Sequence, residues 1–304
     1  MGKPFTLYWS SLATYEECPQ KFLWSRGWGA IDVGAGPGRK KPRPVESSRH
    51  HAIMGITIQG VLEDLYNNEL WKNPKGLKDR LIKMTEERFK LELAGSYIDW
   101  NRSPPKEELL RICIEGVCGY LKTMKHNRLL GPYAKSEVDL VGYVNKYTPI
   151  GGRVDFIVRR DDTGITILDG KNSLHKGKYT DPDQLRWYAL CFYLSYHKMP
   201  DRIGFVYFRY PYGTPIEGGD DVEIGVDWID FSREDLRGVG ERAVEVRRSM
   251  DKGKFEATPT SNACKFCDYE TVCEERQQQK SARSRKRKKK NPDFPENPDG
   301  FFEL

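Results

Sequence analysis

The chain lacks the apolar segments that would hold a protein in a membrane. None of its 304 residues belong to a run of about 18 apolar residues, the length that a spanning helix needs. The pattern of a secretory signal, with basic residues before an apolar stretch, is also missing from its start. We therefore expect a soluble protein with no membrane partner. It would be cytoplasmic in a prokaryotic or phage-infected cell, or nuclear in a eukaryotic one.

A general excess of one charge is missing as well. The formal net charge is +6, but seven of the eight residues from 283 to 290 are basic, and without them the remainder carries −1. Overall charge is thus weak evidence for nucleic-acid binding. The basic block would attract any polyanion, and it also fits a solubilising tail or a nuclear signal.

The spacing of apolar residues changes along the chain. Spacing of three and four residues predicts helices at about 51–71, 77–94, 105–128 and 181–199. Short apolar runs between turn residues predict strands at 136–144, 149–160, 164–172, 202–210 and 221–231. A short helix ending at Pro19 comes first, and Ser232 can cap a last helix. This order predicts an α/β fold with a mixed central sheet.

The same pattern predicts a single domain over residues 1–275. Its helical part would cover about 51–130 and its sheet core about 135–231. Beyond Cys273 the chain is too polar and too rich in charge and proline to bury a core, so residues 276–304 are predicted to be a disordered tail, first basic and then acidic.

Two acidic residues and a lysine lie in neighbouring predicted strands. Asp155 closes the GGRVD motif, and Asp169 and Lys171 lie in ILDGK. Adjacent strands can bring these groups to one rim, where the two carboxylates and the Gly170 carbonyl would hold Mg²⁺ or Mn²⁺. Lys171, two residues after Asp169, faces the same side and can reach an attacking water. Alone, ILDGK is also a common turn pattern.

The full order of motifs resembles the RecB-like PD-(D/E)XK nucleases, which include the AddB nuclease domain and the CRISPR-associated RecB-like exonucleases. SSLATYEECP matches the family's first segment, and Glu137 precedes GGRVD, LDGK and the DQLRWY helix in the family's order. The resemblance covers about residues 7–275. It implies a restriction-endonuclease-like core flanked by helices, with an N-terminal helical insertion. It also implies that Gln184 and Tyr188 orient the scissile phosphate.

One position departs from the family pattern. Gln59 stands where a metal-binding histidine is usual, and a glutamine carbonyl binds hard cations more weakly. Glu63, one helical turn later, is an alternative ligand, and His50 and His51 fit a solvated helix start. Glu137 fits either a residue that supports the metal ligands or a plain strand residue.

Four of the seven cysteines stand apart from the others. Cys113, Cys118 and Cys191 lie in apolar helical stretches, as buried thiols do. Cys264, Cys267 and Cys273 form C-x2-C-x5-C, and Cys18 lies near the N-terminus. The resemblance implies that these four bind a 4Fe–4S cluster clamping the two ends of the chain together, although four thiolates also suit Zn²⁺.

The sequence therefore predicts a metal-dependent deoxyribonuclease, by resemblance an exonuclease acting on single-stranded DNA ends in recombination, repair or CRISPR-type processing. Recombination or CRISPR proteins would be its partners. The alternative is a DNA-binding or assembly module that keeps the nuclease fold but cuts poorly, which Gln59 favours. Side chains proposed to contact a strand, or else to belong to the core, are Arg186, Trp187, Tyr188, Phe208, Arg209 and Tyr210.

Overall fold

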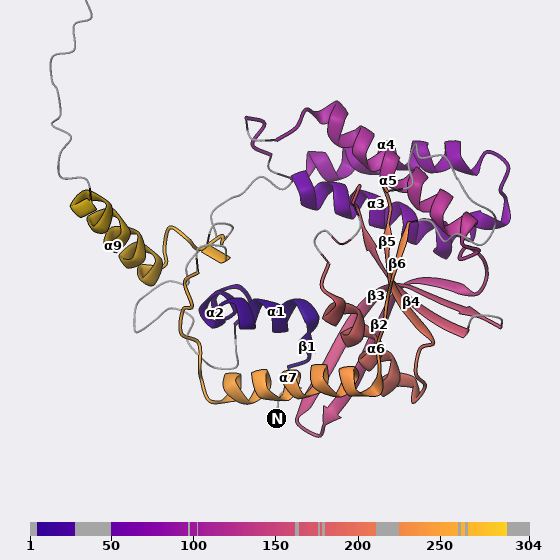
Figure 1. The fold of residues 1–304 in the computed structure, drawn as a ribbon. Coiled ribbons are helices and arrows are strands. Elements are labelled where there is room, and N and C mark those ends of the chain that lie inside the picture. The colour runs from indigo at the N-terminus through magenta and orange to yellow at the C-terminus, as the bar shows by residue number, and fades with distance from the viewer. Residues whose placement is uncertain are drawn as a thin grey trace, which may run out of the picture. The chain divides into compact units, whose positions relative to one another are not determined.

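A computed structural model describes most of the chain (Figure 1). The described residues are 5–27, 50–96, 98–101, 103–161, 164–175, 177, 180–210, 225–260, 263–264 and 267–290. They divide into two compact units, which we describe separately. The sheet unit comprises Met1–Ala13 and Ser47–Lys252, and the terminal unit comprises Thr14–Glu46 and Gly253–Leu304.

The sheet unit contains a mixed sheet, as predicted. Its strands are β1 (Leu7–Tyr8), β2 (Ala134–Asn145), β3 (Thr148–Arg160), β4 (Gly164–Lys171), β5 (Arg202–Tyr207) and β6 (Val226–Ile229). The order is β1-β3-β4-β5-β6, and β2 pairs with β3 along its other edge. The β1–β3 and β4–β5 pairs are parallel and the others antiparallel. The parallel β4–β5 pair requires a crossover, which a helix provides.

Helices cover both faces of this sheet (Figure 1). The helices α3 (His50–Asn67), α4 (Leu77–Ala94) and α5 (Lys106–His126) share a core with side chains from one face, including Phe156, Val158 and Leu168. On the other face lies the crossover helix α6 (Pro182–Tyr196), packed against α7 (Arg233–Asp251). A short 3-10 turn, η1 (Leu70–Lys72), follows α3. Ser232 caps α7 as predicted, because its hydroxyl accepts a hydrogen bond from the Asp235 amide.

The terminal unit joins segments from opposite ends of the sequence. Helix α1 (Trp9–Glu17) runs into it and is followed by α2 (Pro19–Arg26). The Tyr15 hydroxyl donates to the Lys254 carbonyl at 2.5 Å, and the Phe22 and Phe255 rings stack with their centroids 6.4 Å apart. Pro19 was predicted only to end a helix, but it also begins α2, where a missing N–H costs nothing.

The tail differs from the prediction of disorder over its first part. Helix α9 (Glu274–Lys290) occupies residues predicted to be unstructured, since its polar and basic residues are good helix formers. The rest of the predicted tail, residues 291–304, lies outside the described residues. Within the described ranges, every helix is too short or too polar to cross a bilayer.

Candidate active site

The two aspartates of the predicted site meet where β3 and β4 part. The last paired residues of these strands are Phe156 and Leu168, and the aspartates are the next residue on each strand. The Gly170 amide donates a hydrogen bond to Asp155 Oδ2 at 2.7 Å, which ties the two strand ends together. Asp169 is almost fully buried, with 3% of its surface exposed. The structure therefore brings both carboxyl groups to one edge of the sheet.

Lys171 and Gln184 complete a connected polar cluster at this edge. The Lys171 ammonium lies 2.5 Å from Asp169 Oδ2 and donates to Gln184 Oε1 at 3.0 Å. The Gln184 amide in turn donates to Asp169 Oδ1 at 2.9 Å and to the Tyr188 hydroxyl at 3.2 Å. Gln184 lies in the first turn of α6 and Tyr188 one turn later. The first two turns of α6 therefore fix the orientation of the lysine and aspartate side chains.

Burial sets the electrostatics of the aspartate pair. Desolvation and the neighbouring Asp169 raise the pKa of Asp155 well above its ordinary value, against the opposing effect of the Gly170 amide. Desolvation also raises the pKa of Asp169, although the Lys171 ammonium opposes it. Holding both carboxyls ionised is therefore costly, and a cation bound between them would offset this cost.

A small pocket opens beside Asp155 and carries further oxygen donors. It is lined by Gln59 and Glu63 of α3, by Glu137 of β2, and by Asp155 and Gly170. The Gln59 amide donates a hydrogen bond to the Glu137 carboxylate. The unusual glutamine is thus bound to an acidic neighbour in the pocket, while Glu63 lines the same wall.

Glu137 adopts a backbone conformation that the sequence does not signal. Its φ angle is +52°, in the left-handed region, while Ser136 and Val138 on either side pair with β3. Such a conformation is strained in a non-glycine residue and is often found at functional sites. Burial raises the pKa of Glu137. The residue therefore belongs to the pocket rather than to a regular strand face.

At two glycines of the predicted motifs, the missing side chain lets an aromatic ring pack against the backbone. A methyl group at Gly170 would lie 2.1 Å from the Phe208 ring, and one at Gly152 would lie 2.8 Å from the Tyr188 ring. Any side chain there would displace the ring. The glycines of GGRVD and LDGK therefore serve close packing around the acidic residues.

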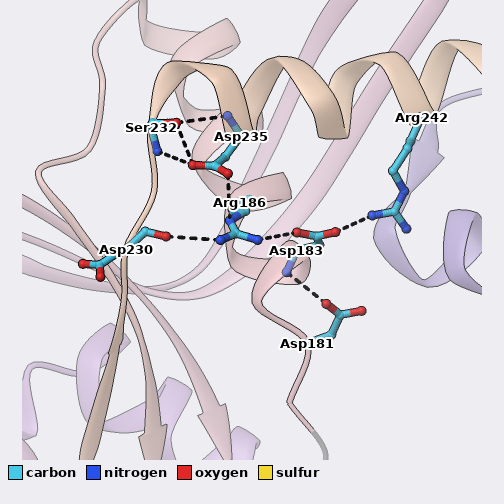
Figure 2. Close-up of polar contacts among 7 residues, drawn as sticks. All are labelled: Asp181, Asp183, Arg186, Asp230, Ser232, Asp235 and Arg242. Carbon is cyan, nitrogen blue, oxygen red and sulfur yellow. Dashed lines mark hydrogen bonds and ion pairs between the residues drawn. The ribbon is translucent and has the colours of Figure 1, made fainter.

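A polar network fixes the start of α6, which carries Gln184 (Figure 2). Asp181 caps the helix by accepting from the Asp183 amide at 3.0 Å. The Asp183 carboxylate forms ion pairs with Arg186 at 2.8 Å and with Arg242 of α7 at 2.5 Å. The sequence alone does not indicate that Asp183 and Arg242 fix the start of this helix. The Asp-Pro-Asp sequence signals a helix start, but nothing in the sequence pairs it with α7.

Most of the side chains proposed to contact a strand have structural roles instead. Trp187 is fully buried, and its indole N–H donates to the Gly151 carbonyl at 2.9 Å. Phe208 is buried in the core, and Arg209 lies 3.0 Å from Glu115. Arg186 forms an ion pair with Asp183, so these four of the six side chains make contacts within the fold.

The four separate cysteines lie together in the terminal unit. Cys18, Cys264, Cys267 and Cys273 line one pocket, and all four are free thiols. Burial raises the pKa of Cys267, and Cys18 and Cys264 raise it further. The structure thus places the four predicted cysteines around one pocket. The other three cysteines are buried, as predicted.

The two sites offer different metal donors. The aspartate cluster provides hard oxygens, which suit Mg²⁺ or Mn²⁺, and the cysteine pocket provides soft sulfurs, which suit iron or zinc. Throughout the part of the chain that the structure describes, no three histidine, cysteine, aspartate or glutamate side chains are grouped closely enough to form a metal site by themselves. Neither the aspartates nor the four cysteines therefore form a complete metal site in the arrangement described.

One of the comparisons with known proteins identifies the family of the chain. The family profile that describes the PD-(D/E)XK nuclease superfamily matches residues 8–274. A search of curated proteins finds no match. Among solved structures, one described as "Crystal structure of SSO0001" is similar, with 17% identity over 56% of this chain and 78% of that chain and a TM-score of 0.32. The family match covers both units and most of the sequence. The chain therefore belongs to the PD-(D/E)XK nuclease superfamily.

Proposed function

We propose that this chain is a metal-dependent DNA exonuclease of the RecB-like type, which hydrolyses phosphodiester bonds at single-stranded ends. The observation that carries the proposal is the connected cluster of Asp155, Asp169, Lys171 and Gln184 at one sheet edge. Membership of a nuclease superfamily supports a nucleic-acid substrate. We take residues 1–275 as one functional domain, and we place its action in recombination, repair or CRISPR-type processing with protein partners from those systems.

We assign a different role in hydrolysis to each of these side chains. Asp155, Asp169 and the Gly170 carbonyl would hold Mg²⁺ or Mn²⁺, with Gln59 or Glu63 as further donors and Glu137 supporting them. When bound, the ion acts as a Lewis acid and lowers the pKa of water. Lys171 is positioned to stabilise negative charge or hold a proton near the attacked phosphate. Gln184 and Tyr188 orient Lys171 and the phosphate.

The test is digestion of end-labelled single-stranded DNA with Mg²⁺ and Mn²⁺, comparing labels at the two ends. We expect Asp155→Asn and Asp169→Asn, which remove metal ligands, and Lys171→Ala, which removes a general acid or base, each to lower the cleavage rate about a hundredfold or more. Lys90→Ala, which removes an exposed lysine from α4, is the control and should cut like the parent. Parent-like cleavage by the three site variants would refute the site assignment.

The second candidate is a DNA-binding or assembly module that cuts poorly. Gln59 favours it, because its amide is bound to Glu137 in the pocket where the family usually has a metal-binding histidine. This candidate predicts that the parent binds single strands yet shows no cleavage with Mg²⁺, Mn²⁺, Co²⁺ or Ni²⁺. Cleavage with any of these metals that depends on Asp155 rules it out.

We also propose that the four cysteines of the terminal unit hold a 4Fe–4S cluster, with Zn²⁺ as the alternative occupant. Their common pocket supports this, since four thiolates satisfy either group once the sulfurs move close enough to bind it. Elemental analysis and absorption spectra of anaerobically purified protein separate iron from zinc. Cys18→Ala should lose the metal, whereas Cys118→Ala in α5 should keep it. Full metal retention by Cys18→Ala would refute the assignment.

A further inference from the structure

A large hollow lies on the α6 face of the sheet, separate from the acidic cluster. It measures about 520 Å³, and apolar residues of β2, β3 and β4 line it. Sites for small organic ligands commonly measure about 300–1,000 Å³. The hollow is therefore large enough for a group the size of a nucleotide.

Basic and aromatic side chains surround this hollow. The cations are Lys135 of β2, Arg159 of β3 and Lys198 just after α6, and no acidic side chain is among its described lining residues. In the described part of the chain, none of these three cations takes part in an ion pair. Three positive charges around an apolar floor would attract a phosphate group.

The aromatic side chains present ring surface at the same place. Tyr196 is 57% exposed, and its ring centroid lies 4.8 Å from that of the buried Phe192. Tyr133 also lines the hollow, and its hydroxyl shares its one proton between the Arg128 and Leu130 carbonyls, each at 3.1 Å, which holds its ring in place. A nucleobase can stack on an exposed ring that its neighbours already hold.

The hollow and the acidic cluster lie at opposite ends of one helix. Gln184 is in the first turn of α6 and Tyr196 is its last residue. Twelve residues at about 1.5 Å each separate them by roughly 18 Å. A strand of several nucleotides can span this distance, but a single nucleotide cannot.

We propose that this hollow is a second binding site for single-stranded nucleic acid. It would hold one nucleotide of the strand, with the base against Tyr196 and the phosphate near Arg159 and Lys198. The proposal rests on the proposed function in one respect, because that function supplies the strand whose other end reaches the acidic cluster. It goes further by naming where the uncut part of the strand is held.

The test measures binding of a labelled single-stranded oligonucleotide in EDTA, so that cleavage plays no part. Tyr196→Ala should weaken binding about fivefold or more, which corresponds to the loss of one stacked base, and Tyr196→Phe should bind like the parent. Replacing both Arg159 and Lys198 with alanine should reduce the slope of log K against log salt by about 1.4, since each phosphate contact on a single strand contributes about 0.7. Lys83→Ala with Lys90→Ala, which removes two charges from α4, is the matched control.

Three results would overturn the proposal. The first is parent-like binding by Tyr196→Ala and by the double variant. The second is an equal effect of the α4 control. The third is that the variants lose affinity for free deoxyadenosine monophosphate but keep their affinity for the strand. This result would assign the hollow to a mononucleotide rather than to a strand. The parent should bind the strand in EDTA whether or not it cleaves with Mg²⁺ or Mn²⁺, so a failure of the nuclease proposal would show as absent cleavage by the parent with the binding results unchanged.

Discussion

Replacing Lys171 with methionine should destabilise the metal-free protein, and the loss should grow with pH. Lys171 lies 2.5 Å from the Asp169 carboxylate, whose side chain is only 4% exposed. Methionine keeps most of the aliphatic packing and removes the positive charge. An uncompensated buried charge costs about 3–5 kcal/mol, and we expect about 3 kcal/mol because the lysine side chain is itself 20% exposed.

The pH dependence follows from the carboxyl group. Burial raises the pKa of Asp169 in the folded parent, and Lys171 is the main group opposing that rise. In the variant the folded-state pKa therefore rises further above the unfolded value of about 3.9. A raised folded-state pKa costs stability as pH rises through it. The free-energy difference from the parent should therefore be largest at neutral pH and fall towards zero near about pH 4.

Urea unfolding in EDTA at several pH values measures this difference. The control is a double-mutant cycle with Asp169→Asn, which removes the buried charge and keeps the oxygen that accepts from Gln184. Lys171→Met should cost much less in that background. A deficit that stays constant with pH, or a double variant as unstable as Lys171→Met alone, would refute the electrostatic reasoning.

Three further predictions test other parts of the structure. Ser232→Ala should lower the free energy of unfolding by about 1 kcal/mol, because it removes the cap that accepts from the Asp235 amide, and urea unfolding measures the loss. Trp187→Phe should lower it by about 1–3 kcal/mol, because the buried Gly151 carbonyl loses its donor; no change in urea midpoint would contradict this. Gln59→His should lower the Mn²⁺ concentration that gives half-maximal cleavage severalfold, and an unchanged or higher requirement would show that this position does not contact the ion.

The sequence predicted the elements of the fold well where periodicity was long and regular. The helix predicted at 77–94 has those bounds in the structure, and the three strands between 136 and 172 are present with slightly different ends. Apolar spacing reports the buried face of an element directly, so these segments needed no tertiary information. The helix that begins at Pro19 was not predicted, because a proline can both end one helix and begin the next.

The site was only partly accessible to such reasoning. Strand alternation placed Asp169 and Lys171 on one face, but the resemblance supplied Gln184 and Tyr188. The left-handed backbone of Glu137 is a case of local strain. The pairing of Arg242 with Asp183 joins residues that are 59 positions apart in the sequence. Neither has a periodic signature, so neither could be predicted.

The terminal unit also bears on how the chain is made. Tyr15 and its partner Lys254 are 239 residues apart in sequence. During synthesis the first helices leave the ribosome long before residues 253–290 are made. Until then, Phe22 and Trp24 lack the rings of Phe255 and Tyr269 that they pack against. Closing so long a loop is slow and entropically costly. The emergence of residues 253–290, rather than that of the sheet, therefore sets the moment at which the terminal unit can form.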